Sequence, residues 1–511
     1  MRGLHQFSTN CGRKRLAAVA AGLLLAAHSP QLMIAVAVAA PAAVQSLAQI
    51  DDAWAAEVAG LLWRAEAGGY GELVKAIRGW QLPDLGERQF VLAIPSEPQT
   101  TPPNWADTPG AQTIWEDFLA ARQARAAGTF TVAVAASQSH DGQTGEAIRL
   151  LYRVLRDDPD HKRARTAGGW VKRQGSWVWP ETARHLDQGE EYSAAFGWLP
   201  KGRQQRYQAG ERYENGRWRK AVADANEPTE SLRRVTGKQP RDLEQRGWKF
   251  ASDHWQITAA SASSGVASLA AQLEDTRTVW LQVFGAFQYE PAEWEQRLEG
   301  RGQRKPLDPF AATLAVDRQA YIAALEAVEP MIGRTLGIYW TPTHTAWFFE
   351  GEGQQATTVH HEATHQLFAE VRKTSPLAGE RCGFWAIEAA ACYMESLEKT
   401  DFGWTVGGRD RGRAPMARER LLEDGFYMTL EELTSLGRRD FQADERLPQI
   451  YSEISGLADF FMNGQRGRYR EAFVEYLVRI HTGTVEADTL SRLCKKSYAE
   501  LDNEYRHHMA R

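Results

Sequence analysis

The stretch that decides how this 511-residue chain folds around a site is Thr358-Val-His-His-Glu-Ala-Thr-His-Gln-Leu-Phe368. Residues four positions apart on a helix lie on the same face, so His361 and His365 can direct two imidazole rings at one metal ion. Glu362 lies one step around the helix from His361, where its carboxylate reaches a water on the metal without binding the metal. This spacing, H-E-x-x-H, is typical of zinc-dependent hydrolysis, although five residues also match by chance.

A catalytic zinc ion commonly has three protein ligands and keeps a fourth position for water, so the sequence should supply one more ligand. A third histidine on the same segment is excluded, because Phe368 and Val371 stand where that pattern requires Gly and His. Glu388 is the best candidate, since it lies in the largely apolar segment 383–396, where a carboxylate without a partner is costly to bury. A bound metal would explain its presence there.

Two neighbours of Glu388 stay open as alternatives. Glu395, at i+7, can share the same helix face as a rival ligand, although a supporting or surface position is the more ordinary role. Cys392, at i+4, can also face inward as a thiolate ligand, but a Cys382–Cys392 disulfide or a small core residue is the expected interpretation. His360 points elsewhere on the motif helix and is not expected to bind the metal.

Two segments together resemble a known group of enzymes. They are His361-Glu-Ala-Thr-His-Gln-Leu367 and Trp385-Ala-Ile-Glu-Ala-Ala-Ala-Cys-Tyr-Met-Glu395, and the pair is similar to the gluzincin zinc metallopeptidases. The pair is most similar to an exported bacterial family of unknown function with a peptidase-MA-like domain, whose second motif is W-x-x-E-G-x-A-x-Y-x-E. Ala389 stands where that motif commonly has glycine. The resemblance extends over residues 245–511.

The resemblance implies an α+β fold for residues 245–511, with a small mixed sheet, an H-E-x-x-H helix and a helical C-terminal part. It also implies Zn2+ as the cofactor and Glu362 as the general base for attack of water on a peptide bond. The zinc ligands that it implies are His361, His365 and Glu388.

Two further features are expected around this centre. The family implies a hydrogen-bond donor from the downstream helices, with Tyr451 as the candidate and His481 in reserve. The strand expected at 346–350 precedes the motif helix and is predicted to be an edge strand that pairs with an extended peptide. The prediction is therefore a zinc metallopeptidase acting on a peptide or protein substrate, and the alternative is a catalytically inactive binding or scaffold protein of the same fold at the cell envelope.

Residues 1–48 contain basic but no acidic side chains, and they include the apolar run 16–27. This composition is typical of an export signal, so the protein is expected in the periplasm, the cell envelope or the medium. Contact with a membrane is expected only if that signal stays attached. The net charge is −5 and no basic run follows the N-terminal segment, so no nucleic-acid partner is expected.

Between the signal and the peptidase-like region the sequence pattern changes once more. Residues 49–165 are expected to be helical, and the segment 146–156 is similar to the second helix of a tetratricopeptide unit. Residues 166–244 are rich in Gly and Trp, and Asn215-Gly216 is typical of a hairpin turn. We expect small β modules there, with tryptophans that form their cores rather than an exposed row for binding.

Overall fold

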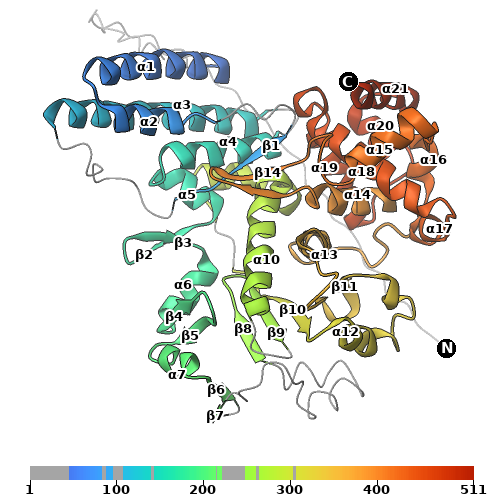
Figure 1. Ribbon diagram of the computed structural model, residues 1–511. Helices are drawn as coiled ribbons and strands as arrows, with labels where there is room; N and C mark the ends of the chain where they lie inside the picture. The colour runs from blue at the N-terminus through green and yellow to red at the C-terminus, as the bar shows by residue number, and fades with distance from the viewer. Residues whose placement is uncertain are drawn as a thin grey trace, which may run out of the picture. The chain divides into compact units, whose positions relative to one another are not determined.

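The computed structural model describes residues 45–82, 88–95, 108–139, 143–214, 216–220, 248–259, 264–302 and 306–511. Val44–Arg511 forms one compact unit with α+β architecture, which confirms the predicted fold class at that level (Figure 1). The predicted export signal lies outside the described residues as far as residue 44. Among the helices that are described, none combines the length and apolar character that a membrane crossing requires.

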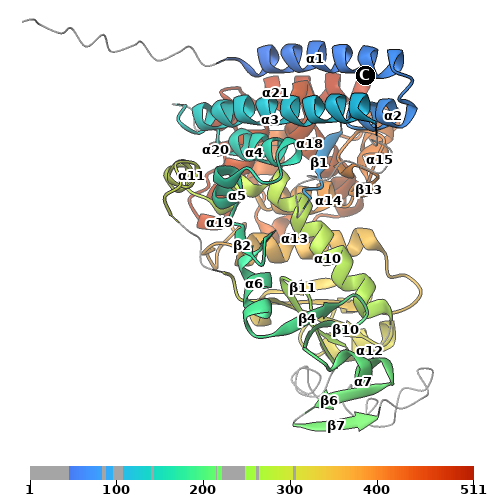
Figure 2. The ribbon, with the colours of Figure 1, turned by 90° about the vertical axis from the view of Figure 1, so that its left-hand side faces the viewer.

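The first part of the described chain is mainly helical, as expected for residues 49–165. Ser46 begins the first helix with a capping box, in which its side chain accepts a hydrogen bond from the Gln49 backbone and the Gln49 side chain returns one. The long third helix packs against both the first and the fourth (Figure 2). The helices are α1 (Leu47–Ala67), α2 (Gly71–Gly79), α3 (Pro109–Ser137), α4 (Thr144–Asp157) and α5 (Lys162–Gly168).

A short strand in this helical part pairs with the C-terminal half of the chain, which the sequence did not predict. Strand β1 (Gln89–Leu92) lies antiparallel to β14 (Gly403–Val406), and β14 pairs in turn with β13 (Glu398–Thr400). The Gln89 side chain also donates hydrogen bonds to the Tyr393 hydroxyl and to Asn463. The helical part is therefore joined to the region around the motif by a shared sheet and a shared core.

The Gly- and Trp-rich part forms small two-stranded hairpins, as predicted. Its elements are β2 (Val171–Arg173), β3 (Ser176–Val178), α6 (Pro180–Asp187), β4 (Glu190–Ser193), β5 (Gly197–Pro200), α7 (Gln204–Gln208), β6 (Glu211–Glu214) and β7 (Arg217–Lys220). Glu214 pairs with Arg217 across the predicted Asn-Gly turn, of which Asn215 lies outside the described residues. Trp170, Trp177, Trp198 and Trp255 are buried, and Trp179, Trp218 and Trp248 are half-buried, so these tryptophans do not form an exposed row.

A five-stranded mixed sheet lies beside the motif helix, with the order β11-β12-β10-β9-β8. Its members are β8 (Trp248–Ala251), β9 (Trp255–Ala259), β10 (Phe310–Ala315), β11 (Ile338–Trp340) and β12 (Thr345–Phe349). The three inner strands are parallel, and β8 and β11 are antiparallel edges.

The prediction that the strand at 346–350 is an edge strand is wrong. Strand β12 pairs on one side with β10 and on the other with β11, so β11 is the edge. Every residue of β12 is buried, and a continuous apolar run such as Ala346-Trp-Phe-Phe349 is what a strand covered on both faces requires.

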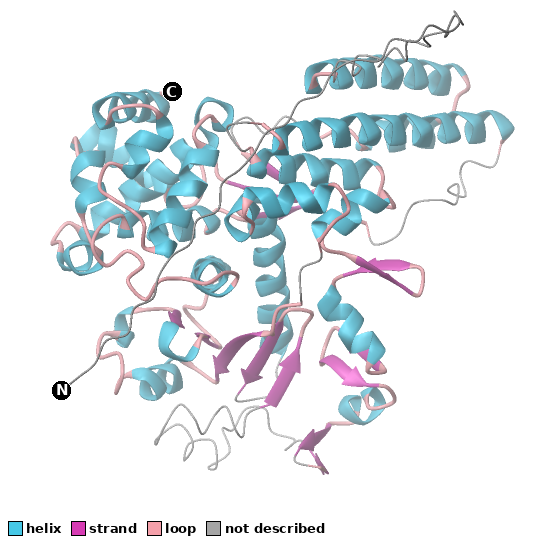
Figure 3. Ribbon diagram, turned by 180° about the vertical axis from the view of Figure 1, so that it is seen from behind, coloured by secondary structure: helices cyan, strands magenta, loops and turns pink. Residues whose placement is uncertain are grey.

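The remaining helices form the C-terminal part and the support of the motif (Figure 3). Helix α10 runs from the sheet to the N-terminal helices and packs along the motif helix α13, which in turn packs against α14. These helices are α10 (Ser264–Val283), α11 (Pro291–Leu298), α12 (Arg318–Leu325), α13 (Ala356–Glu370), α14 (Phe384–Met394), α15 (Ala414–Glu419), α16 (Leu430–Ser435), α17 (Arg438–Ala443), α18 (Leu447–Gly467), α19 (Arg470–Thr482), α20 (Thr489–Cys494) and α21 (Tyr498–Ala510).

Candidate metal centre

Helices α13 and α14 bring together the three predicted ligands. In α13 the apolar residues Val359, Ala363 and Leu367 recur at helical spacing and are buried, which fixes the rotation of this helix. His361 and His365 then lie on a neighbouring, partly exposed face. Helix α14 is buried along its whole length, and Glu388 is the one carboxylate within its bounds.

The donor atoms of these three side chains lie close to the separations of a tetrahedral site. His365 Nε2 is 3.1 Å from His361 Nε2, and the Glu388 carboxylate lies 3.5 Å from His361 Nε2 and 3.7 Å from His365 Nε2. Zinc–ligand distances of about 2.0–2.2 Å place the ligand atoms of a tetrahedron roughly 3.3–3.6 Å apart. The residues present therefore fit a zinc ion, with two imidazole nitrogens and one carboxylate as donors; His361, whose charged form its neighbours favour in the metal-free site, would release its Nε2 proton on binding.

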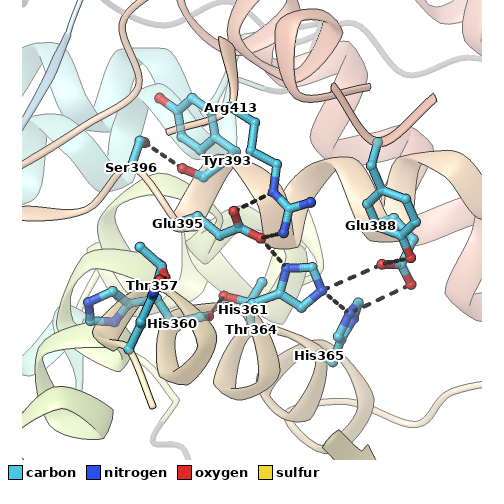
Figure 4. A network of polar contacts seen from close by, with 12 residues as sticks. Thr357, His360, His361, Thr364, His365, Glu388, Tyr393, Glu395, Ser396 and Arg413 are labelled. Carbon is cyan, nitrogen blue, oxygen red and sulfur yellow. Dashed lines mark hydrogen bonds and ion pairs between the residues drawn. The ribbon is translucent and has the colours of Figure 1, made fainter. Parts of the chain in front are cut away.

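His361 is oriented by a chain of charged groups behind it. Its Nδ1 lies 2.8 Å from Glu395 Oε1, and Arg413 donates to both oxygens of that carboxylate, at 2.7 and 2.9 Å. Figure 4 shows Glu395 between the Arg413 guanidinium and the His361 ring, while His361, His365 and Glu388 point toward one another. With Nδ1 held in this way, Nε2 of His361 faces the other two donors.

Electrostatics within this cluster follow from the same contacts. Burial disfavours a charge on His361, but its hydrogen bonds to Cys392, Glu388 and Glu395 outweigh burial and raise its pKa well above the usual value. Burial likewise opposes the charge of Glu388, but His365 and His361 lower its pKa well below the usual range. The Glu388 carboxylate is therefore ionised, as a metal ligand requires.

Tyr451, on α18, is adjacent to the third ligand. Its hydroxyl donates to Glu388 Oε2 at 3.0 Å. Burial, and then the negative charge of Glu388, raise the pKa of Tyr451 above its usual value. The phenol thus stays protonated and available as a hydrogen-bond donor at this centre.

Glu362 lies against the edge strand of the sheet. Its Oε2 accepts a hydrogen bond from the Tyr339 backbone N–H at 2.8 Å. The approach of strand β11 to α13 is close at Gly337, where a Cβ atom would lie 2.8 Å from Thr358 Cγ2 and 3.2 Å from Glu362 Cγ. Glycine at this position therefore sets the distance between the motif helix and the sheet edge.

No protein-family model matches the sequence, and no curated protein matches it. The function is therefore inferred from the geometry of the centre and from the residues that build it.

Other residues singled out from the sequence lie outside the three-donor cluster. His360 is buried against α10, where its Nδ1 contacts the Thr276 hydroxyl at 2.8 Å, as expected for a residue that binds no metal. His481 does not join the cluster, so the prediction that it is the alternative hydrogen-bond donor to Tyr451 is wrong. The His481 ring stacks on Phe368, and its Nδ1 contacts the Leu477 carbonyl of its own helix α19.

The three cysteines within the described residues, Cys382, Cys392 and Cys494, are free buried thiols, so the disulfide alternative for Cys382 and Cys392 is wrong. Cys382 lies near the Val485 carbonyl, whereas Cys392 faces His361 and Glu395, and these three form a second set of side chains close enough to hold a metal. Arg413 already occupies both oxygens of Glu395, which argues against a metal in this second set.

Sequence reasoning missed two partners of the site. Arg413 comes from a loop with no helical periodicity to place it, so no local signal pointed to Glu395. Tyr339 acts through its backbone N–H, which carries no side-chain signature. Only the pairing of strand β11 at the sheet edge reveals it.

Proposed function

We propose that this protein is an exported zinc-dependent peptidase of the gluzincin type. The observation that carries the proposal is the convergence of His361 Nε2, His365 Nε2 and the Glu388 carboxylate. Glu362 lies beside His361 on the motif helix. A buried carboxylate in an apolar helix, placed at tetrahedral separation from two imidazoles, is the donor set of a catalytic rather than a structural zinc site.

His361, His365 and Glu388 would hold a zinc ion, which would supply a Lewis acid to polarise a carbonyl and to lower the pKa of a water toward about 7. Glu362 takes the proton of the attacking water and delivers it to the leaving amine. Tyr451, held protonated beside Glu388, donates a hydrogen bond to the oxygen on which negative charge develops. Glu395 and Arg413 keep His361 in the orientation that the metal requires.

An extended peptide is the substrate class that the sheet edge supports. Among the strands of the described residues, β11 pairs with β12 on one side and with none on the other. The Tyr339 N–H is directed away from β12, because it donates to Glu362. A peptide that adds along this edge passes directly beside the general base, which itself accepts from the Tyr339 N–H.

The experiment compares wild-type protein with Glu362→Gln, both loaded with zinc. Each is incubated with a library of unstructured peptides, and the products are read by mass spectrometry. Wild type is expected to cleave, while Glu362→Gln keeps its zinc and loses at least roughly 100-fold in rate, because only the general base is removed. A wild type that holds zinc but cleaves nothing contradicts the peptidase and favours the alternative, an inactive binding protein of the same fold.

A further inference from the structure

Arg413 uses only one edge of its guanidinium within the protein. Its Nε and Nη2 donate to the two oxygens of Glu395, at 2.7 and 2.9 Å. A guanidinium has a second edge, formed by Nη1 and Nη2, which can hold another carboxylate by the same pair of hydrogen bonds. Within the described residues no hydrogen bond or ion pair reaches Nη1, and Figure 4 shows the guanidinium with its contacts on the side of Glu395 alone.

The outer edge of Arg413, formed by Nη1 and Nη2, is exposed and yet held in place. The Arg413 side chain is 45% exposed, whereas the Glu395 side chain that fixes it is only 8% exposed. The backbone before Arg413 is also fixed, because Gly412 has a φ of +56° and a Cβ atom there would lie 3.3 Å from Ser396 Cβ. A cation that is already oriented loses little conformational freedom when it binds an anion.

This outer edge lies close to the metal centre. The Arg413 guanidinium carbon is 5.6 Å from the centre of the Tyr451 ring, and the Tyr451 hydroxyl donates to Glu388. The contacts through Glu395 and His361 keep Nη2 within roughly 10 Å of the metal position. An extended chain advances about 3.3–3.6 Å per residue, so a substrate carboxylate at Arg413 belongs to a residue within about four positions of the bond that is attacked.

The charges already present at the centre leave room for one more anion. The Glu395 carboxylate is paired with both Arg413 and His361. A bound zinc ion together with Arg413 would balance the carboxylates of Glu362, Glu388 and Glu395. A substrate carboxylate therefore meets no excess of negative charge at the outer edge of Arg413.

We propose that the outer edge of Arg413 binds a carboxylate of the peptide substrate and so directs cleavage to bonds close to an acidic group. The C-terminal carboxylate and the side chains of Asp and Glu are the two groups of a peptide that offer this chemistry. A neutral main-chain carbonyl has no charge and one oxygen, so a carboxylate is the group that the planar edge binds best. The assignment rests on the proposed function, because it names the substrate class of the same centre.

The test measures which peptides are retained by zinc-loaded Glu362→Gln protein, which is expected to bind substrate without turnover. Three matched pools of N-acetylated peptides are quantified by mass spectrometry: C-terminal amides that contain glutamine, the same peptides with a free C-terminal carboxylate, and the amides with glutamate in place of glutamine. At least one acidic pool should be retained roughly 10- to 100-fold better than the neutral pool, the usual value of hydrogen bonds between charged groups, and the pool that gains identifies the source of the carboxylate. Equal retention of all three pools overturns the proposal. A wild type that retains acidic peptides but cleaves none contradicts the peptidase alone.

Arg413→Gln, made in the same Glu362→Gln protein and measured at saturating zinc, should abolish the preference for acidic peptides. This change also loosens His361, but that effect is the same for all three pools, so the ratio of acidic to neutral peptides reports on the outer edge of Arg413. Arg411→Gln is the matched control, because Arg411 is 40% exposed and pairs with Glu398, and it should leave the ratio unchanged. A preference that survives in Arg413→Gln overturns the assignment. Should that variant fail to fold or to hold zinc, Arg413→Lys, which keeps the charge and loses the planar edge, must still lower the ratio severalfold.

Discussion

Replacing Glu395 with glutamine tests how the zinc ligand His361 is held. The amide still accepts a hydrogen bond from His361 Nδ1, now 2.8 Å from the carboxylate, but the negative charge is lost. Arg413, which donates to both oxygens of Glu395, keeps only one acceptor. His361 therefore loses both basicity and a fixed orientation.

The size of the effect follows from these contacts. A hydrogen bond assisted by a charge contributes roughly 1.5–3 kcal/mol, about twice a neutral one, so losing the assistance costs about 1–1.5 kcal/mol. That corresponds to zinc affinity lower by roughly 5- to 15-fold, near the lower end of the 10- to 100-fold typical of residues that support metal ligands. Glu388→Gln, which removes a ligand, should cost far more.

The assay is competition for zinc between the protein and a chelator of known affinity. Wild type, Glu395→Gln and Glu388→Gln are compared, with Glu398→Gln as control because Glu398 lies on β13 and pairs with Arg411 and Arg88 rather than with His361. A larger loss for Glu395→Gln than for Glu388→Gln would refute the ligand set and place the metal beside Cys392 and Glu395. An unchanged affinity in Glu395→Gln would refute the supporting role.

Three further changes have defined outcomes. Tyr451→Phe should keep zinc content and lower peptide hydrolysis by about 100-fold, since only the donor to the developing oxyanion is lost; zinc analysis and kcat check this. Gly337→Ala should lower the free energy of unfolding by about 1–3 kcal/mol in urea denaturation, because its Cβ collides with Thr358. Glu453 is buried, and burial raises its pKa from 4.5 to about 8, so the folded state holds its proton more tightly. Its contribution to stability is complete below pH 4.5 and is lost as the pH rises toward 8. Glu453→Gln should remove this loss, so its free energy of unfolding should rise relative to that of wild type by about 2–4 kcal/mol between about pH 5 and pH 8. Denaturation at each pH measures this, and a difference between the two proteins that does not change with pH contradicts it.

The parts of the centre that the sequence predicted are those governed by local geometry. His361 and His365 share a face because helical spacing requires it, and Glu388 was found because a carboxylate in an apolar helix needs a partner. Pairing between strands that are far apart in the sequence could not be predicted. The order of strands places β11 at the edge instead of β12, and β1 joins β14 from the far half of the chain.

Arg413 illustrates the same limit at the level of side chains. No periodicity connects a loop arginine with Glu395, so their contact is visible only in the folded chain. Cys392 shows the reverse case. The predicted export to an oxidising compartment suggested a disulfide, but the rotation of α14 turns the Cys392 thiol toward His361. Burial of the tryptophan hairpins was predictable, because small β modules have few other apolar side chains to form a core.

The most direct measurement of the central claim is zinc K-edge X-ray absorption of the zinc-loaded protein. Coordination by His361, His365 and Glu388 predicts a shell of nitrogen and oxygen atoms at about 2.0–2.2 Å, with the multiple-scattering signature of two imidazoles and no sulfur. The Glu388→Gln variant should lose this coordination shell, because one of the three ligands is removed. A sulfur atom at about 2.3 Å would place Cys392 in the coordination sphere, and failure of the protein to retain zinc would contradict the account altogether.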